Sequence, residues 1–250
     1  MDIGAYLKRI NFQQEVEVAK EVLFELQRAH LLAVPFENLD IHYGTKIELD
    51  LDAIYAKIVN NRRGGFCYEL NGLFFQLLKE IGFDVKIISA RVFDKERGYG
   101  PEYDHLAIIA NVNNKDYLVD VGFGKFSFSP LELTLGIELT DEYGKFKFDK
   151  YKDGYLRINQ VENGKLIPQY IFKTKTLDFS EFEGICAYYQ TSPDSHFTQK
   201  KVISISTIEG RKTLNDTQLK ITKDGIEEVI EFNREDFELK LYEHFKIRIN

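Results

Sequence analysis

The sequence predicts an α+β fold, in which a helical bundle comes first, an antiparallel β-barrel or sheet follows, and a shorter part of strands and one helix ends the chain. Apolar residues recur at spacings of three and four up to about residue 82. From Phe83 they lie in short runs rich in Val, Ile, Phe and Tyr, which turn pairs separate. The 250 residues, 44% of them hydrophobic, are enough to enclose a sizeable core. We expect three packed parts, residues 1–82, 83–190 and 191–250, because no Pro/Gly/Ser-rich linker separates them.

Three helices are expected in the first part. Their apolar faces cover residues 16–30, 51–58 and 70–81. Pro35 turns the chain after the first helix, and Asp50 has the position of an N-cap before the second. Gly82 follows the third helix, whose apolar stripe is the strongest, and closes it.

Strands are expected from Phe83 onward, with tight turns between them. The turn pairs are Asn113-Asn114, Asp153-Gly154 and Asn163-Gly164. Later strands are expected over residues 202–208, 218–222 and 226–232. A last helix over residues 234–245 begins at Asn233, with Asp236 three residues on as the second member of a capping-box-like pair.

The charge balance and the cysteines exclude several classes of protein. Thirty-three basic and 40 acidic side chains leave a net charge of −7, which argues against binding to nucleic acid or to an anionic membrane. No apolar run approaches the roughly 20 residues of a membrane helix, and the first residues do not resemble a signal peptide. We therefore expect a cytoplasmic protein. Cys67 and Cys186 are expected to be free thiols, and no Cys/His cluster predicts a metal site.

The strongest chemical signal lies in residues 62–71, Arg-Arg-Gly-Gly-Phe-Cys-Tyr-Glu-Leu-Asn. The glycines allow a tight turn, after which Cys67 falls in the first turn of the third helix, on its inward face. Unpaired backbone N–H groups and the positive end of the helix dipole favour a thiolate there. Cys67 is therefore the expected nucleophile. Cys186 has no such setting and is interpreted as a small buried hydrophobe.

A thiolate nucleophile needs a base and a group that orients the base. Residues 104–112 and 115–122, on either side of Asn113-Asn114, predict the two strands of a β-hairpin in which Val112 opposes Lys115. In this register His105 and Asp120 share one face as diagonal neighbours, roughly 7–8 Å apart at the backbone. A buried carboxylate needs a partner, so this pairing predicts the base and its orienting acid.

These segments resemble the arylamine N-acetyltransferase family. The resemblance is carried, in the family's order, by Val34-Pro35-Phe36-Glu37-Asn38-Leu39, residues 63–71, Asp104-His105-Leu106, Asp120-Val121-Gly122-Phe123-Gly124 and Ser192-Pro193-x-Ser195-x-Phe197. It implies a helical bundle, a β-barrel and an α/β lid around a cysteine-protease-like core. The insertion typical of the mammalian enzymes after the barrel is missing, which indicates a bacterial-type member.

The resemblance also implies a Cys-His-Asp triad, made here by Cys67, His105 and Asp120. The implied reaction is a ping-pong acetyl transfer from acetyl coenzyme A, through a Cys67 thioester, to an arylamine, arylhydrazine or N-hydroxyarylamine. No metal is implied. The residues expected at the acceptor and the developing oxyanion are Phe36, Phe93, Gly122, Phe123 and Gly124. The residues expected near coenzyme A are Ser192, Ser195, Thr198, Lys200 and Lys201, with the two lysines toward its phosphates.

The triad alone leaves the acyl acceptor open. Thiol proteases and transglutaminase-like hydrolases have the same order of Cys, His and Asp on a helix followed by a barrel. A binding protein with an inactive triad is the third interpretation. A narrow aromatic pocket favours the acetyltransferase, an open cleft favours the protease, and an unreactive Cys67 thiol favours the binding protein.

Overall fold

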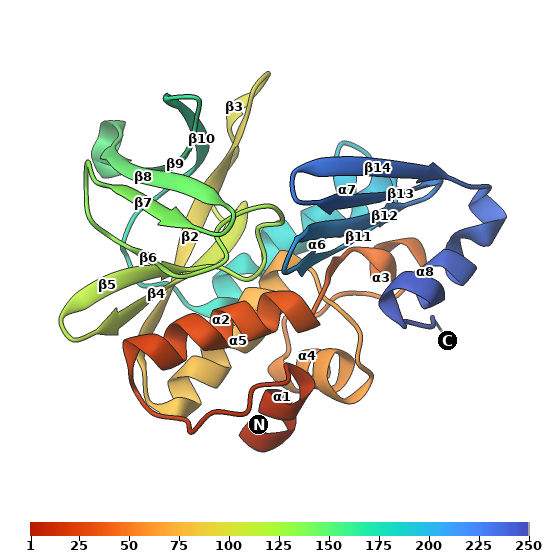
Figure 1. Ribbon diagram of the computed structural model, residues 1–250, viewed down its shortest axis with the longest axis horizontal. Helices are drawn as coiled ribbons and strands as arrows, with labels where there is room; N and C mark the ends of the chain where they lie inside the picture. Colours follow the sequence, from red (N-terminus) through yellow and green to blue (C-terminus); the bar gives the residue numbers. More distant parts are fainter. Residues whose placement is uncertain (250) are drawn as a thin grey trace. The chain divides into compact units, whose positions relative to one another are not determined.

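The computed structural model describes residues 1–249 (Figure 1). The chain divides into two compact units. Unit 1 contains Met1–Gln13, Ala29–Leu70 and the chain from Glu183 onward, and unit 2 contains Gln14–Arg28 and Asn71–Phe182. The division into three parts at residues 82 and 190 stays a prediction.

Helices build most of the chain up to Gly82. They are α1 (Ile3–Arg9), α2 (Lys20–Ala33), α3 (Leu39–His42), α4 (Leu51–Tyr55), the π-helix η1 (Ala56–Asn60) and α5 (Cys67–Ile81). The prediction missed α1 and α3, and it started α2 too early, because the β-branched Val16 and Val18 precede the helix and Val18 is 50% exposed. Asp50 caps α4 as expected, since its carboxylate accepts the Ala53 N–H at 2.8 Å. Within residues 1–249, none of the helices is long and apolar enough to span a membrane.

Helix α5 confirms the expected third helix, with Cys67 in its first turn as expected, at the first helical position. The predicted apolar stripe is buried at Leu70, Phe74 and Leu77. Gly82 follows the helix with a φ of 108°, a backbone conformation that favours glycine. Its N–H bonds to Leu78 O at 3.2 Å, which closes the last turn.

Unit 2 contains the predicted antiparallel barrel-like sheet. Its strands are β2 (Asp84–Asp94), β3 (Gly98–Tyr99), β4 (His105–Val112), β5 (Lys115–Val119), β6 (Leu131–Glu132), β7 (Glu138–Asp141), β8 (Gly144–Lys150), β9 (Leu156–Glu162) and β10 (Lys165–Phe172). The order is β6-β5-β4-β2-β10-β9-β8-β7, with β3 paired to β2, and Figure 1 shows the sheet curling round on itself. Phe146, Phe148, Ile158 and Phe172 are fully buried in its core, so side chains fill the inside.

The hairpin of β4 and β5 has the predicted register. Val112 pairs with Lys115, and Asn113 and Asn114 have φ values of 53° and 60°, as a two-residue type I′ turn requires. The strand pairing ends at Val119, however, whereas the sequence predicted a strand as far as Gly122. Asp120 therefore lies on the loop that leaves the strand, where its backbone N–H donates to Gln27 Oε1 at 3.3 Å.

The last part of the chain contributes a second sheet, which belongs to unit 1. Its order is β1 (Phe36–Glu37), β11 (Val202–Thr207), β12 (Gly210–Asn215), β13 (Gln218–Lys223) and β14 (Ile226–Glu231). The helices of this part are α6 (Glu183–Thr191), α7 (His196–Gln199), η4 (Arg234–Asp236) and α8 (Phe237–Phe245). Two short helices belong to unit 2: η2 (Lys152–Gly154), between β8 and β9, and η3 (Phe179–Phe182), after β10. Strand β12 was missed because only Leu214 of its six residues is buried.

The chain around the end of this sheet differs from the prediction at the last helix and leaves one edge strand exposed. The predicted Asn233-Asp236 capping pair is wrong: Asn233 makes no capping bond, because the chain first forms the short η4 turn and α8 begins only after Asp236. Strand β14 is the edge of the sheet, and all six of its residues are exposed.

Candidate active site

His105 and Asp120 form a buried hydrogen-bonded pair in unit 2. His105 is the first residue of β4, and Asp120 directly follows β5. His105 Nε2 lies 2.7 Å from Asp120 Oδ2, and the two residues are 3% and 2% exposed. Because an ionised carboxylate only accepts hydrogen bonds, Nε2 carries the proton, and Nδ1 is the nitrogen able to take one.

Four donors hold the Asp120 carboxylate. Oδ2 accepts the Tyr170 hydroxyl at 3.1 Å in addition to His105. Oδ1 accepts Asn71 Nδ2 at 2.9 Å and the Gly122 N–H at 2.9 Å. Burial, and then the charge of Asp120, raise the pKa of Tyr170 well above its ordinary value, so the phenol stays protonated as a donor. The carboxylate is thereby fixed in orientation toward the imidazole.

Asn71 is a positioning residue that the sequence reasoning did not single out. It lies on α5 and is fully buried. Its Nδ2 also donates to Leu106 O at 2.7 Å, and its Oδ1 accepts the Val121 N–H at 2.9 Å, so one amide joins the start of β4 to the loop after β5. The only sequence signal for Asn71 is its position at the end of the Cys-Tyr-Glu-Leu-Asn stretch, four residues after Cys67.

The glycine turn after Asp120 differs in part from what was expected. Gly122 was expected to stabilise the developing oxyanion. Its N–H already donates to Asp120 Oδ1, so it anchors that carboxylate instead. Phe123 contacts the imidazole directly: its ring centroid lies 5.1 Å from that of His105 and 5.0 Å from that of Tyr170. A role for Phe123 in binding an acceptor stays a prediction.

Cys67 lies in unit 1, at the first position of α5. The turn before it is tight: a Cβ on Gly64 would lie 2.2 Å from Pro35 O, and the Gly65 N–H donates to the same oxygen at 3.2 Å. Cys67 is 6% exposed. Cys186 is 1% exposed, and burial raises the pKa of its thiol to about 12, which agrees with the inert role expected of it.

The other two expected aromatic residues lie in different units. Phe36 belongs to unit 1, where it packs near Phe66 and Phe197 with ring centroids 5.7 and 6.2 Å away. Phe93 lies on β2 in unit 2 and packs on Tyr99 at 5.2 Å. A role for either in binding an acceptor stays a prediction.

The hydroxyl groups expected near coenzyme A hold their own loop together. Ser195 is 2% exposed; its hydroxyl donates to Tyr189 O at 2.9 Å and accepts the Phe197 N–H, which makes it the N-cap of α7. The Thr198 hydroxyl lies 2.9 Å from Ser192 O. The Ser192 hydroxyl accepts the Asp194 N–H at 3.2 Å. These side chains shape the loop, and contact with coenzyme A stays a prediction.

The two expected lysines differ from each other. Lys200 is exposed. The ammonium of Lys201 lies 4.6 Å from the Phe237 ring centroid and 3.6 Å from Asp216 Oδ1. Lys201 therefore already has structural partners, and Lys200 is the better of the two for a phosphate.

A network of buried charges in unit 1 was not predicted. Arg63 donates to Glu37 through two nitrogens, at 2.8 and 2.9 Å, and to Asp40 at 2.8 Å. Lys57 joins Asp40 Oδ2, at 2.7 Å, to both carboxylate oxygens of Glu69, at 2.8 and 2.9 Å. The network thus connects the Pro-Phe-Glu-Asn segment with the residues around Cys67. In sequence alone these charges look like solvated surface residues.

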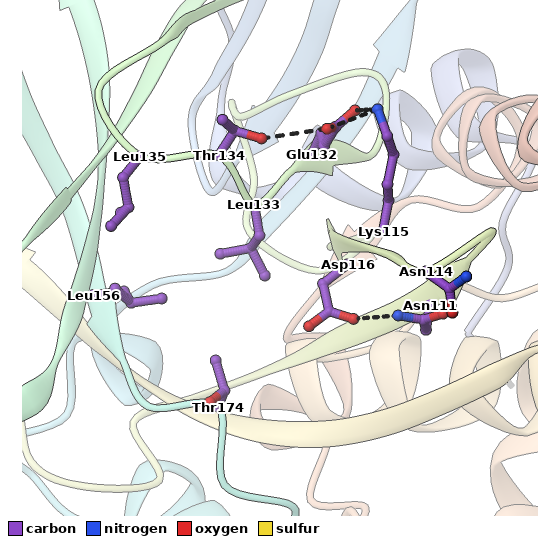
Figure 2. A pocket seen from close by; sticks show the side chains of 10 residues that line it. All are labelled: Asn111, Asn114, Lys115, Asp116, Glu132, Leu133, Thr134, Leu135, Leu156 and Thr174. Atoms are coloured by element: carbon purple, nitrogen blue, oxygen red, sulfur yellow. Dashed lines mark hydrogen bonds and ion pairs between the residues drawn. The ribbon is translucent and has the colours of Figure 1, made fainter.

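Asp116 faces a separate cavity near the turn of the β4–β5 hairpin. The cavity has a volume of about 460 Å³ and is lined by residues of unit 2 that include Asn111, Lys115 and Glu132 (Figure 2). Asp116 Oδ1 accepts Asn111 Nδ2 at 2.7 Å, and Lys115 pairs with Glu132. Asp116 is thus bonded to an amide and not to an imidazole, which distinguishes it from Asp120.

Comparisons with known proteins agree with this fold. The profile of the N-acetyltransferase family matches residues 20–250. Arylamine N-acetyltransferase 2 of Rattus norvegicus is 34% identical over 230 residues, which cover 84% of this chain and 79% of that protein. The solved structure of the M. smegmatis arylamine N-acetyltransferase has a TM-score of 0.90 at 30% identity, covering 99% of this chain and 92% of that one. The Mycobacterium marinum structure in complex with CoA has a TM-score of 0.90 at 29% identity, covering 98% and 93%.

The fold and these matches define the chain as an acetyltransferase enzyme. Its relatives include both vertebrate and bacterial proteins. It belongs to the arylamine N-acetyltransferase family.

Proposed function

We propose that the protein transfers acetyl groups from acetyl coenzyme A to an aromatic amine, hydrazine or N-hydroxylamine by a ping-pong mechanism through Cys67. The observation that carries the proposal is the His105–Asp120 pair, whose carboxylate is held by four donors. Such rigid fixing of a base is what a thiol nucleophile needs.

In the first half-reaction the Cys67 thiolate attacks the thioester carbonyl of acetyl coenzyme A. The tetrahedral oxyanion collapses, the bond from carbon to the sulfur of coenzyme A breaks, and imidazolium gives its Nδ1 proton to the departing thiolate. In the second half-reaction the amine attacks acetyl-Cys67, passes a proton to His105, and releases the Cys67 thiolate. Asp120 holds the imidazole tautomer and stabilises imidazolium throughout.

The position of Cys67 supports its role as the nucleophile. It begins α5, where backbone N–H groups and the helix dipole favour an anion. Asn71 lies one helical turn further along the same helix and bonds directly to Asp120. We propose that Cys67 Sγ approaches His105 Nδ1, the ring nitrogen that Asp120 does not hold.

The aromatic surroundings of the base support the proposed acceptor class. The Phe123 ring packs against His105, and the Tyr170 ring lies 5.7 Å from His105 and 5.0 Å from Phe123, measured between ring centroids. We propose that an aryl ring binds beside Phe123, with Phe36 and Phe93 as further walls.

We also propose that the protein acts in the cytoplasm and does not bind nucleic acid.

The donor is proposed to be acetyl coenzyme A, since the related M. marinum protein has been solved with CoA. Its phosphates require cations, and exposed Lys200 is the nearest match among the residues expected there. We propose no metal in this reaction.

Intact-protein mass spectrometry tests the proposed function. Mixing with acetyl coenzyme A should add one acetyl group, and peptide mapping should place it on Cys67. Adding an arylamine should remove it and yield the N-acetylated amine. If the protein gains no acetyl mass while acetyl coenzyme A is present in excess, or the label lies elsewhere, the ping-pong mechanism is wrong.

Replacing Lys200 by glutamine should raise the KM for acetyl coenzyme A severalfold, because an exposed lysine–phosphate contact contributes only about 1 kcal/mol. The rate at which acetylated enzyme reacts with amine should not change. Lys201→Gln is the comparison: it removes the same charge from a residue held by Phe237 and Asp216, and should lower thermal stability more than donor affinity. An unchanged KM for Lys200→Gln would mean that the phosphates bind other groups.

A further inference from the structure

Helix α5 begins with a capping bond made from inside the helix. Glu69, at the third helical position, accepts the Phe66 N–H through Oε2 at 2.7 Å. This is one half of a capping box, because Phe66 has no side-chain oxygen to return the bond. Phe66 immediately precedes Cys67 and is fully buried, so the bond fixes the backbone from which the nucleophile projects.

The cap brings a buried negative charge close to the nucleophile. The Glu69 side chain is 3% exposed, and that of Lys57, from η1, is 14% exposed. Burial raises the pKa of Glu69, which the Lys57 ammonium and the Phe66 N–H oppose. Burial would lower the pKa of Lys57, but Glu69, Glu37 and Asp40 outweigh it and raise that pKa. Lys57 Nζ lies 2.8 and 2.9 Å from the two Glu69 carboxylate oxygens, and this geometry is that of an ion pair.

Lys57 is the cation that meets the Glu69 carboxylate directly. The other titratable groups that face Glu69 are Glu37, from β1, and the Cys186 thiol, from α6. Neither is a cation. Arg63 bonds to Glu37 and Asp40, at the other end of the network. The compensation of Glu69 thus depends on Lys57.

We propose that Lys57 is a positioning residue for Cys67: it neutralises the Glu69 carboxylate, which then fixes the Phe66 N–H without opposing the thiolate two residues away. The inference rests on the proposed function, because it takes Cys67 as the nucleophile. Without Lys57, the Glu69 carboxylate either stays charged and repels the Cys67 thiolate, or takes a proton and then accepts a weaker hydrogen bond from the Phe66 N–H.

The test is the pH dependence of Cys67 alkylation by iodoacetamide, followed by peptide mass spectrometry between pH 4 and 9. Loss of a cation disfavours the thiolate, so Lys57→Met should raise the midpoint by about one pH unit. At a pH below both midpoints, the alkylation rate of Lys57→Met should then be about tenfold lower than that of the wild-type protein. Glu69→Gln removes an anion but keeps an oxygen for the cap, so its midpoint should fall. Lys57→Met combined with Glu69→Gln should return close to the wild-type midpoint, as should Lys57→Arg alone.

Lys240→Met is the control, since it removes the same charge from an ion pair with Glu243 on α8 and should leave the midpoint unchanged. A wild-type midpoint in folded Lys57→Met overturns the proposal. If circular dichroism shows that this variant does not fold, Glu69→Gln decides, and an unchanged or raised midpoint there overturns it. Alkylation needs no acetyl coenzyme A. A wild-type protein that takes up no acetyl group would therefore count against the proposed function alone.

Discussion

Replacing Cys67 by alanine should abolish acetyl transfer, with a loss of about 10⁶-fold in kcat or a fall to the uncatalysed rate. The reason is that the proposed acyl intermediate forms on Cys67 and the other thiol is a poor substitute: Cys186 is buried, and that burial raises the pKa of its thiol to about 12. The measurement is product formation by chromatography, together with the intact mass after incubation with acetyl coenzyme A. The variant should show no added acetyl group.

Cys186→Ala is the matched control. It removes the other thiol, which lies on α6 and accepts a hydrogen bond from Gln190 at 3.3 Å. The variant should keep its activity and lose about 1 kcal/mol of stability from the small cavity. If Cys67→Ala stays active, or if Cys186→Ala loses activity while it stays folded, the assignment of Cys67 as the nucleophile is wrong.

Asp120→Asn should reduce kcat/KM about 10⁴-fold while the protein stays folded. The hydrogen bonds determine how an amide fits. Asn71 Nδ2 and the Gly122 N–H can only donate, so the amide oxygen must face them. The NH₂ group then faces His105 Nε2, which must become an acceptor, and the imidazole proton moves to Nδ1. This is the wrong tautomer for accepting a proton from a thiol.

Asp116→Asn makes the same chemical change on the same hairpin and should keep nearly full activity. Asp116 has a single amide partner, Asn111, and lies beside the cavity near the hairpin turn. Steady-state kinetics and thermal unfolding of both variants make the comparison. Normal acetylation by Asp120→Asn would remove the proposed role of the pair, whatever the result for Asp116→Asn.

The His105–Asp120 pairing was predictable because local chemistry determines it. Two asparagines in a two-residue turn set the register of the hairpin, and the register determines which residues share a face. The end of β5 was not predictable, because the apolar pattern continues through Val121. The strand ends where the Asp120 and Val121 N–H groups bond to Gln27 and Asn71, which are remote in sequence.

The partners of Asp120 and the network around Lys57 were missed for the same physical reason. Asn71 and Tyr170 lie 49 and 50 positions from Asp120, and neither has a spacing that marks it. Lys57 and Glu69 are charged residues of the kind that usually lie in water. Only the packing of β1, α3, η1 and α5 around them makes their charges buried, and a sequence pattern does not record that packing.

Strand β14 has a consequence for how copies of this protein behave toward one another in solution. It leaves one row of backbone groups unpaired at the sheet edge and exposes Ile226, Val229 and Ile230. Edges of this kind invite aggregation. The other three residues of the strand are glutamates, of which Glu227 pairs with Lys220 of β13 at 2.9 Å. Two such strands side by side, about 4.8 Å apart, would bring Glu228 and Glu231 of both copies close together. Repulsion between the two rows of carboxylates therefore opposes edge-to-edge pairing of two copies, although the edge itself is open and partly apolar.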